Sequence, residues 1–242
     1  MPETILMIFE GEKAEVKIYE KLYTNYFSTD SNTIIISSYN TNIYKLWKEL
    51  YKDEYLDIVE VIREKNEQNR IKLNGIDRDQ IAQVYLFFDH DAHDPDASNE
   101  IIESMLHFYQ EETDHGKLYI SYPMVEALKD FSIDVEYKNT MCPIARNIEY
   151  KKFVNKKTIF QDLRKIFKKD WDYIIGENLK KGNFITTGNY SIIPFKDLHK
   201  ICQINIFEMQ KIKYIEPQQM VSVLSGFPFF IAEYFGEDHY VF

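Results

Sequence analysis

Short apolar runs alternate with amphipathic runs over the first 131 residues of this 242-residue chain. Four apolar runs have the length and continuous hydrophobicity of strands covered on both faces: 5–9, 32–37, 84–89 and 117–121. Three intervening runs repeat apolar residues at helical spacing: 14–26, 43–51 and 98–110. Strands that alternate with helices form a parallel sheet with helices on its faces. The sequence therefore predicts an α/β fold built on a parallel sheet.

The pattern changes near residue 140. Residues 156–181 have the spacing of one amphipathic helix, and two further stretches, 195–215 and 220–235, are also expected to be helical. Within the charged stretch 53–80, residues 56–64 are compatible with either strand or helix, and residues 69–80 are expected to form an excursion from the sheet. We therefore predict two domains, an α/β catalytic domain over residues 1–138 and a mainly helical C-terminal domain over residues 139–242 that packs on it.

Carboxylates follow three of the predicted strands. Asp89 and Asp91 end the 84–89 run, Glu10 ends the first run, and Glu126 follows the 117–121 run. The C-terminal ends of parallel strands meet at the edge of the sheet where ligands bind. We therefore expect these four residues to share one catalytic, metal-binding cleft, with Glu15 as a further metal ligand.

Oxygen-only ligands favour Mg²⁺ or Mn²⁺ at such a site. Alternation along a strand turns His90 away from the two aspartates on either side of it. Asp94 is a reserve ligand. The alternative for the aspartate-rich stretch is a solvated acidic turn, and the glutamates could be ordinary surface charges.

The net charge of −10 conceals a basic segment, because residues 146–181 contain 11 Lys+Arg against 5 Asp+Glu. These cations could hold a phosphate backbone: Arg146, Lys151, Lys152, Lys156, Lys157, Arg164, Lys165, Lys168 and Lys169. We name Lys156, Lys157, Lys168 and Lys169, with Lys13 near the first strand, as nucleic-acid-binding residues. Interleaved aromatic residues could stack on unpaired bases: Tyr137, Tyr150, Phe153, Trp171 and Tyr173. The alternatives are a solvated helix face and ordinary core aromatics.

Residues 4–131 resemble the Toprim family. The segment "ILMIFEGEKAE" is similar to its first motif, a hydrophobic strand ending in Glu-Gly, and "FFDHD" is similar to its Asp-x-Asp motif. The segments "EGEKAE" and "YPMVEAL" narrow the resemblance to the OLD-like and RloB-like bacterial defence nucleases. Pro123 and Tyr122 depart from the residues that those two groups carry before the last glutamate. The resemblance implies a Toprim-like, Rossmann-like sheet and a Mg²⁺-dependent nuclease that acts in anti-phage, abortive-infection defence.

Two rival functions remain open. A glycosyltransferase also places Asp-x-Asp after a strand, although this leaves Glu10 and Glu126 unexplained. A non-catalytic module could keep the fold only to bind a partner protein. The expected partner is DNA or RNA, and a second copy of the chain is a further candidate. The sequence has no GxxxxGK[ST] motif, so an ATPase that works with this protein would be a separate polypeptide. No apolar run approaches the ~20 residues of a membrane span, and the two distant cysteines favour neither a disulfide framework nor a zinc site. We therefore expect no membrane partner and a cytoplasmic location.

Overall fold

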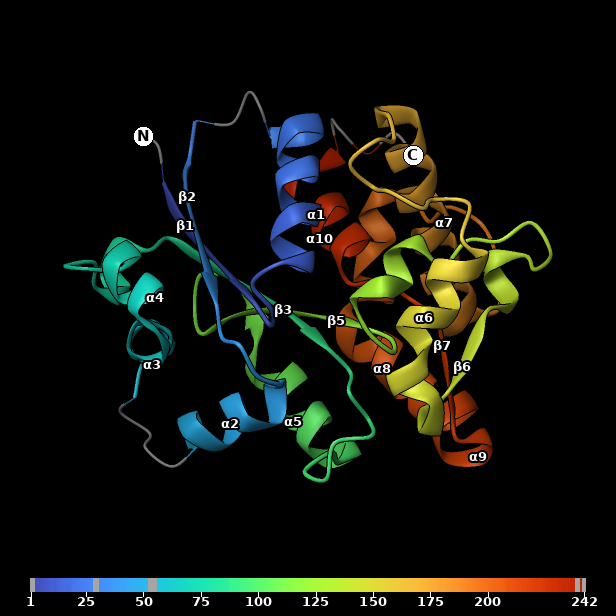
Figure 1. The fold of residues 1–242 in the computed structure, drawn as a ribbon, viewed down its shortest axis with the longest axis horizontal. Helices are drawn as coiled ribbons and strands as arrows, with labels where there is room; N and C mark the ends of the chain where they lie inside the picture. The colour runs from blue at the N-terminus through green and yellow to red at the C-terminus, as the bar shows by residue number, and fades with distance from the viewer. Residues whose placement is uncertain (1–2, 28–30, 52–55, 238–239, 241–242) are drawn as a thin grey trace. The chain divides into compact units, whose positions relative to one another are not determined.

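The structure is a computed structural model. It describes residues 3–27, 31–51, 56–237 and 240, without the side chains of residues 146–148, so the predicted role of Arg146 lies outside the described part. The chain forms two compact units, of which unit 1 comprises residues 1–88 and 100–118, and unit 2 comprises residues 89–99 and 119–242 (Figure 1). The proposed domains, 1–138 and 139–242, stay a prediction.

A mostly parallel five-stranded sheet has the strand order β2-β1-β3-β5-β4. The strands are β1 (Thr4–Phe9), β2 (Thr33–Ser38), β3 (Gln83–Asp89), β4 (Gln110–Glu111) and β5 (Gly116–Ser121). β1 pairs in parallel with β2 and β3, whereas the short edge strand β4 is antiparallel to β5. The predicted α/β class and the four predicted strands are confirmed. The short β4 was not predicted.

Residues along β1 are fully buried on both sides of the sheet. Ile5, Leu6, Met7, Ile8 and Phe9 are all 0% exposed, although successive side chains point to opposite faces. Such a strand cannot show the apolar–polar alternation of a half-exposed sheet. The continuous hydrophobic runs in the sequence therefore have a direct structural cause.

Helices flank this sheet in unit 1. They are α1 (Ala14–Leu22), which continues as a π-helical turn over Tyr23–Phe27, α2 (Ile43–Tyr51), α3 (Ile58–Lys65), α4 (Glu67–Lys72) and α5 (Asn99–Phe108), whose first residue belongs to unit 2 (Figure 1). The ambiguous segment 56–64 forms most of helix α3, which the Asp57 side chain caps, and Asn66 caps α4 in the same way. Asn69 of α4 donates to the Ser38 carbonyl and accepts from its amide, which covers part of the outer edge of β2.

Unit 2 is mainly helical. Its helices are α6 (Asn147–Lys157), α7 (Lys168–Thr187), α8 (Gln203–Gln210), α9 (Glu216–Gln218) and α10 (Phe227–Tyr234), and a two-stranded antiparallel sheet joins β6 (Met141–Pro143) to β7 (Met220–Ser222). The expectation of helices alone is therefore wrong, because the apolar stretch 220–235 begins with a strand. Part of the 195–215 stretch is also not α-helical, since Phe195–Ile201 is a 3₁₀ helix and Lys211–Ile215 is a π-helical turn.

The predicted single helix over residues 156–181 is also wrong. α6 ends at Lys157 and α7 begins only at Lys168. The buried hydroxyl of Thr158 donates to the Lys129 carbonyl and accepts from the Phe160 amide, and the Ile159 amide donates to the Phe131 carbonyl. These bonds lead the chain out of the helix, and nothing in the periodicity of the sequence reports them.

The core of unit 2 forms around α7. Trp171, Ile174, Leu179 and Ile185 are all 0% exposed. Gly182 lets the Phe229 ring of α10 approach, because a Cβ atom at this position would lie only 2.7 Å from that ring. Across the described ranges, the structure contains no helix with both the length and the apolar character needed to cross a bilayer.

Candidate metal and nucleic-acid sites

The first strand end lies beside the central strand β3. The Glu10 amide donates to the Phe87 carbonyl at 3.1 Å, and the Glu10 carbonyl accepts from the Asn40 amide at 2.8 Å. The Glu10 side chain is half-buried. Its backbone is therefore fixed by hydrogen bonds to residues on either side of the end of β1.

Glu15 has a local role in this turn. It is 7% exposed, and its carboxylate accepts a hydrogen bond of 3.1 Å from the Gly11 amide. A Cβ atom at Gly11 would lie 3.0 Å from the Glu15 Oε2 atom, so the glycine leaves room for this carboxylate. The Glu-Gly-x-x-x-Glu spacing is thus accounted for by the turn itself, and the predicted metal-ligand role of Glu15 stays a prediction.

Asp89 and Asp91 flank a buried histidine at the C-terminal end of β3. Asp89 is the last residue of the strand, and both aspartates are half-buried. His90 is 1% exposed, and its ring lies 5.1 Å from that of Tyr122 and 6.2 Å from that of Phe207. Burial lowers the pKa of His90 to about 4, so this histidine is neutral at pH 7. The burial of His90 agrees with the alternation predicted from the sequence.

The backbone turns sharply after the strand. Asp91 has a φ of 43°, in the left-handed region that aspartate tolerates better than most residues. The Asp91 carbonyl accepts from the Asp94 amide at 2.9 Å, and the Asp94 carboxylate accepts from the Asp96 amide at 2.8 Å. The Asp94 side chain therefore stabilises the turn. His93 lies beside the pair, with its Nδ1 atom 3.9 Å from the Asp91 carboxylate.

Glu126 is held by a lysine. It lies in the 3₁₀ helix Val125–Lys129, is 7% exposed, and contacts the Lys151 ammonium group at 2.8 Å. Lys151 extends from α6 and is 61% exposed. A metal at Glu126 would have to compete with this cation, and the predicted metal-ligand role of Glu126 stays a prediction.

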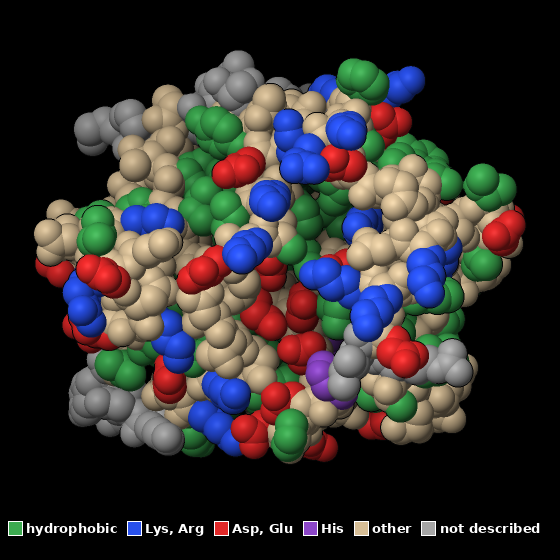
Figure 2. Space-filling model, viewed as in Figure 1, with side chains coloured by type: hydrophobic (Ala, Val, Ile, Leu, Met, Phe, Trp, Pro, Cys, Tyr) green, Lys and Arg blue, Asp and Glu red, His purple; other side chains and the backbone are tan. Residues whose placement is uncertain are grey.

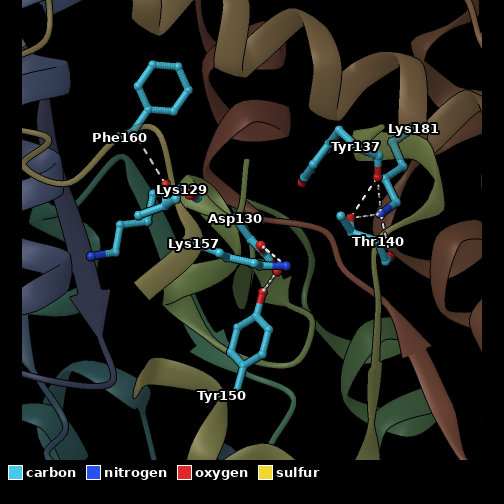
Figure 3. Close-up of polar contacts among 9 residues, drawn as sticks. Lys129, Asp130, Tyr137, Thr140, Tyr150, Lys157, Phe160 and Lys181 are labelled. Atoms are coloured by element: carbon cyan, nitrogen blue, oxygen red, sulfur yellow. Dashed lines mark hydrogen bonds and ion pairs between the residues drawn. The ribbon is translucent and has the colours of Figure 1, made fainter. Parts of the chain in front are cut away.

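A second carboxylate, Asp130, is buried four residues later. It is 1% exposed, and it accepts a hydrogen bond of 2.7 Å from the Tyr150 hydroxyl and contacts the Lys157 ammonium group at 2.7 Å (Figure 3). Burial raises the pKa of Tyr150, and the Asp130 carboxylate raises it further, so the hydroxyl stays a donor. Sequence reasoning did not single out Asp130, because an aspartate after a lysine looks like an ordinary surface charge.

Lys181 is a fully buried cation in the same unit. Its ammonium group donates to the Tyr137 carbonyl at 2.8 Å, the Thr140 carbonyl at 2.8 Å and the Thr140 hydroxyl at 2.7 Å (Figure 3). Burial lowers the pKa of Lys181 well below its usual value, and Lys157 adds to this, whereas Asp130 opposes it. The three oxygens tie the segment before β6 to α7, which indicates a structural role.

The predicted nucleic-acid-binding lysines differ in their surroundings. Lys157 contacts the buried Asp130, and Lys168 forms an ion pair of 2.8 Å with Asp172. Lys13, Lys156 and Lys169 are exposed, and no ion pair involving them is found among the described residues. Basic and acidic side chains are interspersed on the face of the molecule shown in Figure 2. The basic segment is thus partly neutralised by its own acidic neighbours.

The aromatic residues of this segment separate into two groups. Tyr137, Tyr150 and Trp171 are only 5%, 2% and 0% exposed, so they belong to the core and cannot stack on bases. Phe153 and Tyr173 are 55% and 50% exposed. The core alternative is therefore correct for the first three residues, and the stacking prediction stays open for the last two.

Among the described residues, no group of three or more His, Cys, Asp or Glu side chains is arranged to hold a metal ion. Mg²⁺ does not need such a group, because proteins usually bind it through one or two carboxylates, with water and substrate phosphate completing its shell. The half-buried oxygen donors of Asp89 and Asp91 fit this requirement. Comparison of the chain with models of protein families, with curated proteins and with solved structures finds no match.

Proposed function

We propose that the protein is a Mg²⁺- or Mn²⁺-dependent phosphodiesterase that acts on nucleic acid, with its metal at the C-terminal end of β3. The observation that carries the proposal is the Asp89–Asp91 pair, two half-buried carboxylates of which Asp89 ends the central strand of a mostly parallel sheet and Asp91 lies in the turn after it. Ligands bind at this end of the strands in open α/β sheets. The left-handed backbone at Asp91 supports the proposal, because sparsely populated conformations cluster at functional sites.

The two aspartates would hold the ion, and the buried His90 between them would keep the turn in place. A bound divalent cation activates water and stabilises the charge of a phosphodiester under attack. His90 is buried beside the rings of Tyr122 and Phe207 and its pKa is lowered, so it takes up no proton at neutral pH. Asp94 shapes the turn that follows.

Glu126 and Lys151 would act on the substrate side. Lys151 is largely exposed and is held in place by the buried Glu126, which positions a cation to attract a phosphate. Glu10 belongs to the other compact unit, and its part in metal binding stays a prediction. A Toprim-like fold, a role in anti-phage defence, and a partner ATPase or second copy of the chain are further proposals, which rest on the sequence motifs alone.

The proposal is tested by incubating the full chain with plasmid, single-stranded DNA and tRNA in Mg²⁺, Mn²⁺ or EDTA. We expect cleavage that EDTA abolishes and that falls by orders of magnitude in the Asp89→Asn, Asp91→Asn double variant. A matched control is the Asp114→Asn, Asp134→Asn double variant, which makes the same chemical change at two exposed positions. Full metal-dependent cleavage by the Asp89→Asn, Asp91→Asn protein would refute the proposed site.

A further inference from the structure

Helix α6 exposes most of its side chains. It buries Tyr150 and Val154, which are 2% and 0% exposed, so only a narrow stripe faces the core. Most of its remaining described residues face solvent. Over residues 147–157 the helix has four lysines and a single acidic residue, Glu149. A helix with so small a buried face and such an excess of positive charge is suited to contact a polyanion.

Two of the four lysines are fixed by carboxylates beneath the helix. Glu126 holds Lys151 at 2.8 Å, and Asp130 holds Lys157 at 2.7 Å. The Asp130–Lys157 pair is shielded from water, with side chains 1% and 22% exposed, so Lys157 is held in a fixed position. Lys151 is 61% exposed, so Glu126 restrains its ammonium group less strongly. Asn155 lies between them in sequence and accepts a hydrogen bond of 2.6 Å from the Lys129 ammonium group, which adds a third cation beside the helix.

The other two lysines face solvent. Lys152 and Lys156 are exposed, and within the described ranges neither forms an ion pair. They are one helical turn apart, which places them on the same side of α6 with a separation of about 6 Å along its axis. The first turn of α7 differs, because there Lys168 pairs with Asp172.

An exposed aromatic ring lies next to these lysines. Phe153 is 55% exposed, and the Lys157 ammonium group lies 4.3 Å from the centre of its ring. This cation–π contact covers part of the ring and limits its rotation. Exposing a large apolar side chain to water is unfavourable, and contact with a binding partner would bury part of this surface.

We propose that α6 binds a single strand of nucleic acid, with Lys152 and Lys156 on its phosphates and Phe153 stacked on an unpaired base. Basic grooves with exposed aromatic rings bind single strands in this way, whereas paired bases in a duplex hide their faces within the stack. A lipid surface fits less well, because a membrane-binding helix needs a broad apolar face and the exposed side of α6 offers one ring among polar residues. This inference rests on the proposed function only in taking nucleic acid as the substrate.

Binding is measured by fluorescence anisotropy in EDTA, which prevents cleavage, with a labelled single strand of DNA or RNA, the corresponding duplex, and vesicles of anionic phospholipid. We expect the wild type to prefer the single strands. Lys152→Gln with Lys156→Gln should weaken binding and reduce the slope of log affinity against log salt by about 1.4, since each phosphate contact on a single strand contributes ~0.7. Phe153→Ala should weaken single-strand binding by about 5- to 150-fold and leave that slope unchanged.

The control is Lys196→Gln with Lys200→Gln, which removes two exposed lysines at the same sequence spacing elsewhere in unit 2, of which Lys200 pairs with Asp197 at 2.9 Å. This control should bind like the wild type. An equal loss of affinity in the control would show that binding follows net charge alone and would overturn the proposal. So would no binding of single strands by the wild type, equal binding of the duplex, or a preference for vesicles. Single-strand binding without cleavage in Mg²⁺ would instead refute the proposed activity and leave this inference intact.

Discussion

Two pairs of carboxylates in unit 2 lie in contrasting surroundings. Glu126 and Asp130 are buried, at 7% and 1% exposed, and each contacts a lysine of α6. Asp89, the last residue of β3, and Asp91, in the turn after it, are only half-buried, with a neutral histidine between them. The first pair is neutralised by the protein itself. The second pair retains access to solvent, as a site that takes up a cation requires.

The contrast shows that carboxylates after a strand can lie in very different surroundings. Asp89, Asp91 and Glu126 look alike in the sequence, since each follows an apolar run. The structure separates them by their surroundings, because Glu126 contacts a lysine of α6 whereas Asp89 and Asp91 lie on either side of the buried His90. Substitutions at the first pair should therefore lower stability, whereas substitutions at Asp89 and Asp91 should lower metal affinity and leave stability without metal unchanged.

The largest effect on stability is expected at the Asp130–Lys157 pair. Lys157→Met leaves a buried carboxylate with the Tyr150 hydroxyl but without its cation, and should lower the free energy of unfolding by about 3 kcal/mol. Lys156→Met, one residue away and exposed, should change it by less than about 0.5 kcal/mol. Chemical denaturation of both variants at pH 7 measures the difference. Equal, small effects would show that Asp130 and Lys157 are not coupled.

The second prediction concerns acid and the histidine between the aspartates. Because the pKa of His90 is lowered to about 4 in the folded protein, the unfolded chain binds a proton here at higher pH than the folded protein does. Stability therefore falls as the pH drops from about 6.5 towards 4, and the part due to His90 should be about 2 kcal/mol between pH 7.5 and pH 5.

Carboxylates also titrate near the lower end of this range, so the test compares variants. The free energy of unfolding of His90→Gln should depend less on pH between 7.5 and 5 than that of the wild type, whereas His107→Gln, at an exposed histidine, should behave like the wild type. An unchanged pH dependence in His90→Gln would indicate that His90 becomes protonated in the folded protein.

The smallest effect is expected in the turn after β1, where Glu15 is also an inward-facing carboxylate. Gly11→Ala should cost up to about 1 kcal/mol, because its Cβ atom would lie 3.0 Å from the Glu15 carboxylate. In a Glu15→Ala background the same change should cost less, since the crowding is gone. A double-mutant cycle on the free energy of unfolding measures this coupling. A coupling energy of zero would contradict the assigned role of Glu15 in the turn.

The parallel strands were predictable because burial on both faces leaves continuous apolar runs, as in β1 and β3. The antiparallel edge strand β4 was not predictable, because a strand of two residues is too short to show an alternation of apolar and polar side chains. The break between α6 and α7 was missed for a different reason. It depends on the bonds of Thr158 to Lys129 and Phe160, which are contacts of tertiary structure rather than of local pattern.

The candidate site was predictable to a similar extent. The rule about strand ends singles out Asp89 and Asp91 as candidates, and alternation along the strand predicts that His90 points away from them. The pairing of Glu126 with Lys151 was not predictable, because the lysine comes from a helix 25 residues later in the chain. The burial of Tyr150 and Trp171 also depends on which side of each helix faces the core. In the sequence, a basic segment with aromatic residues is consistent both with aromatic side chains in the core and with aromatic side chains exposed to stack on bases.

The most direct test of the central claim is the binding of Mn²⁺, as a spectroscopic substitute for Mg²⁺, measured by electron paramagnetic resonance on the wild type and on two variants. The account predicts that the wild type binds the ion, that Asp89→Asn with Asp91→Asn loses at least tenfold in affinity, and that Glu126→Gln retains it. The double variant should be as stable as the wild type without metal, because removing like charges relieves repulsion, and should gain less stability when metal is added. Unchanged Mn²⁺ affinity in the double variant, or a loss confined to Glu126→Gln, would contradict the assignment of the metal to the end of β3.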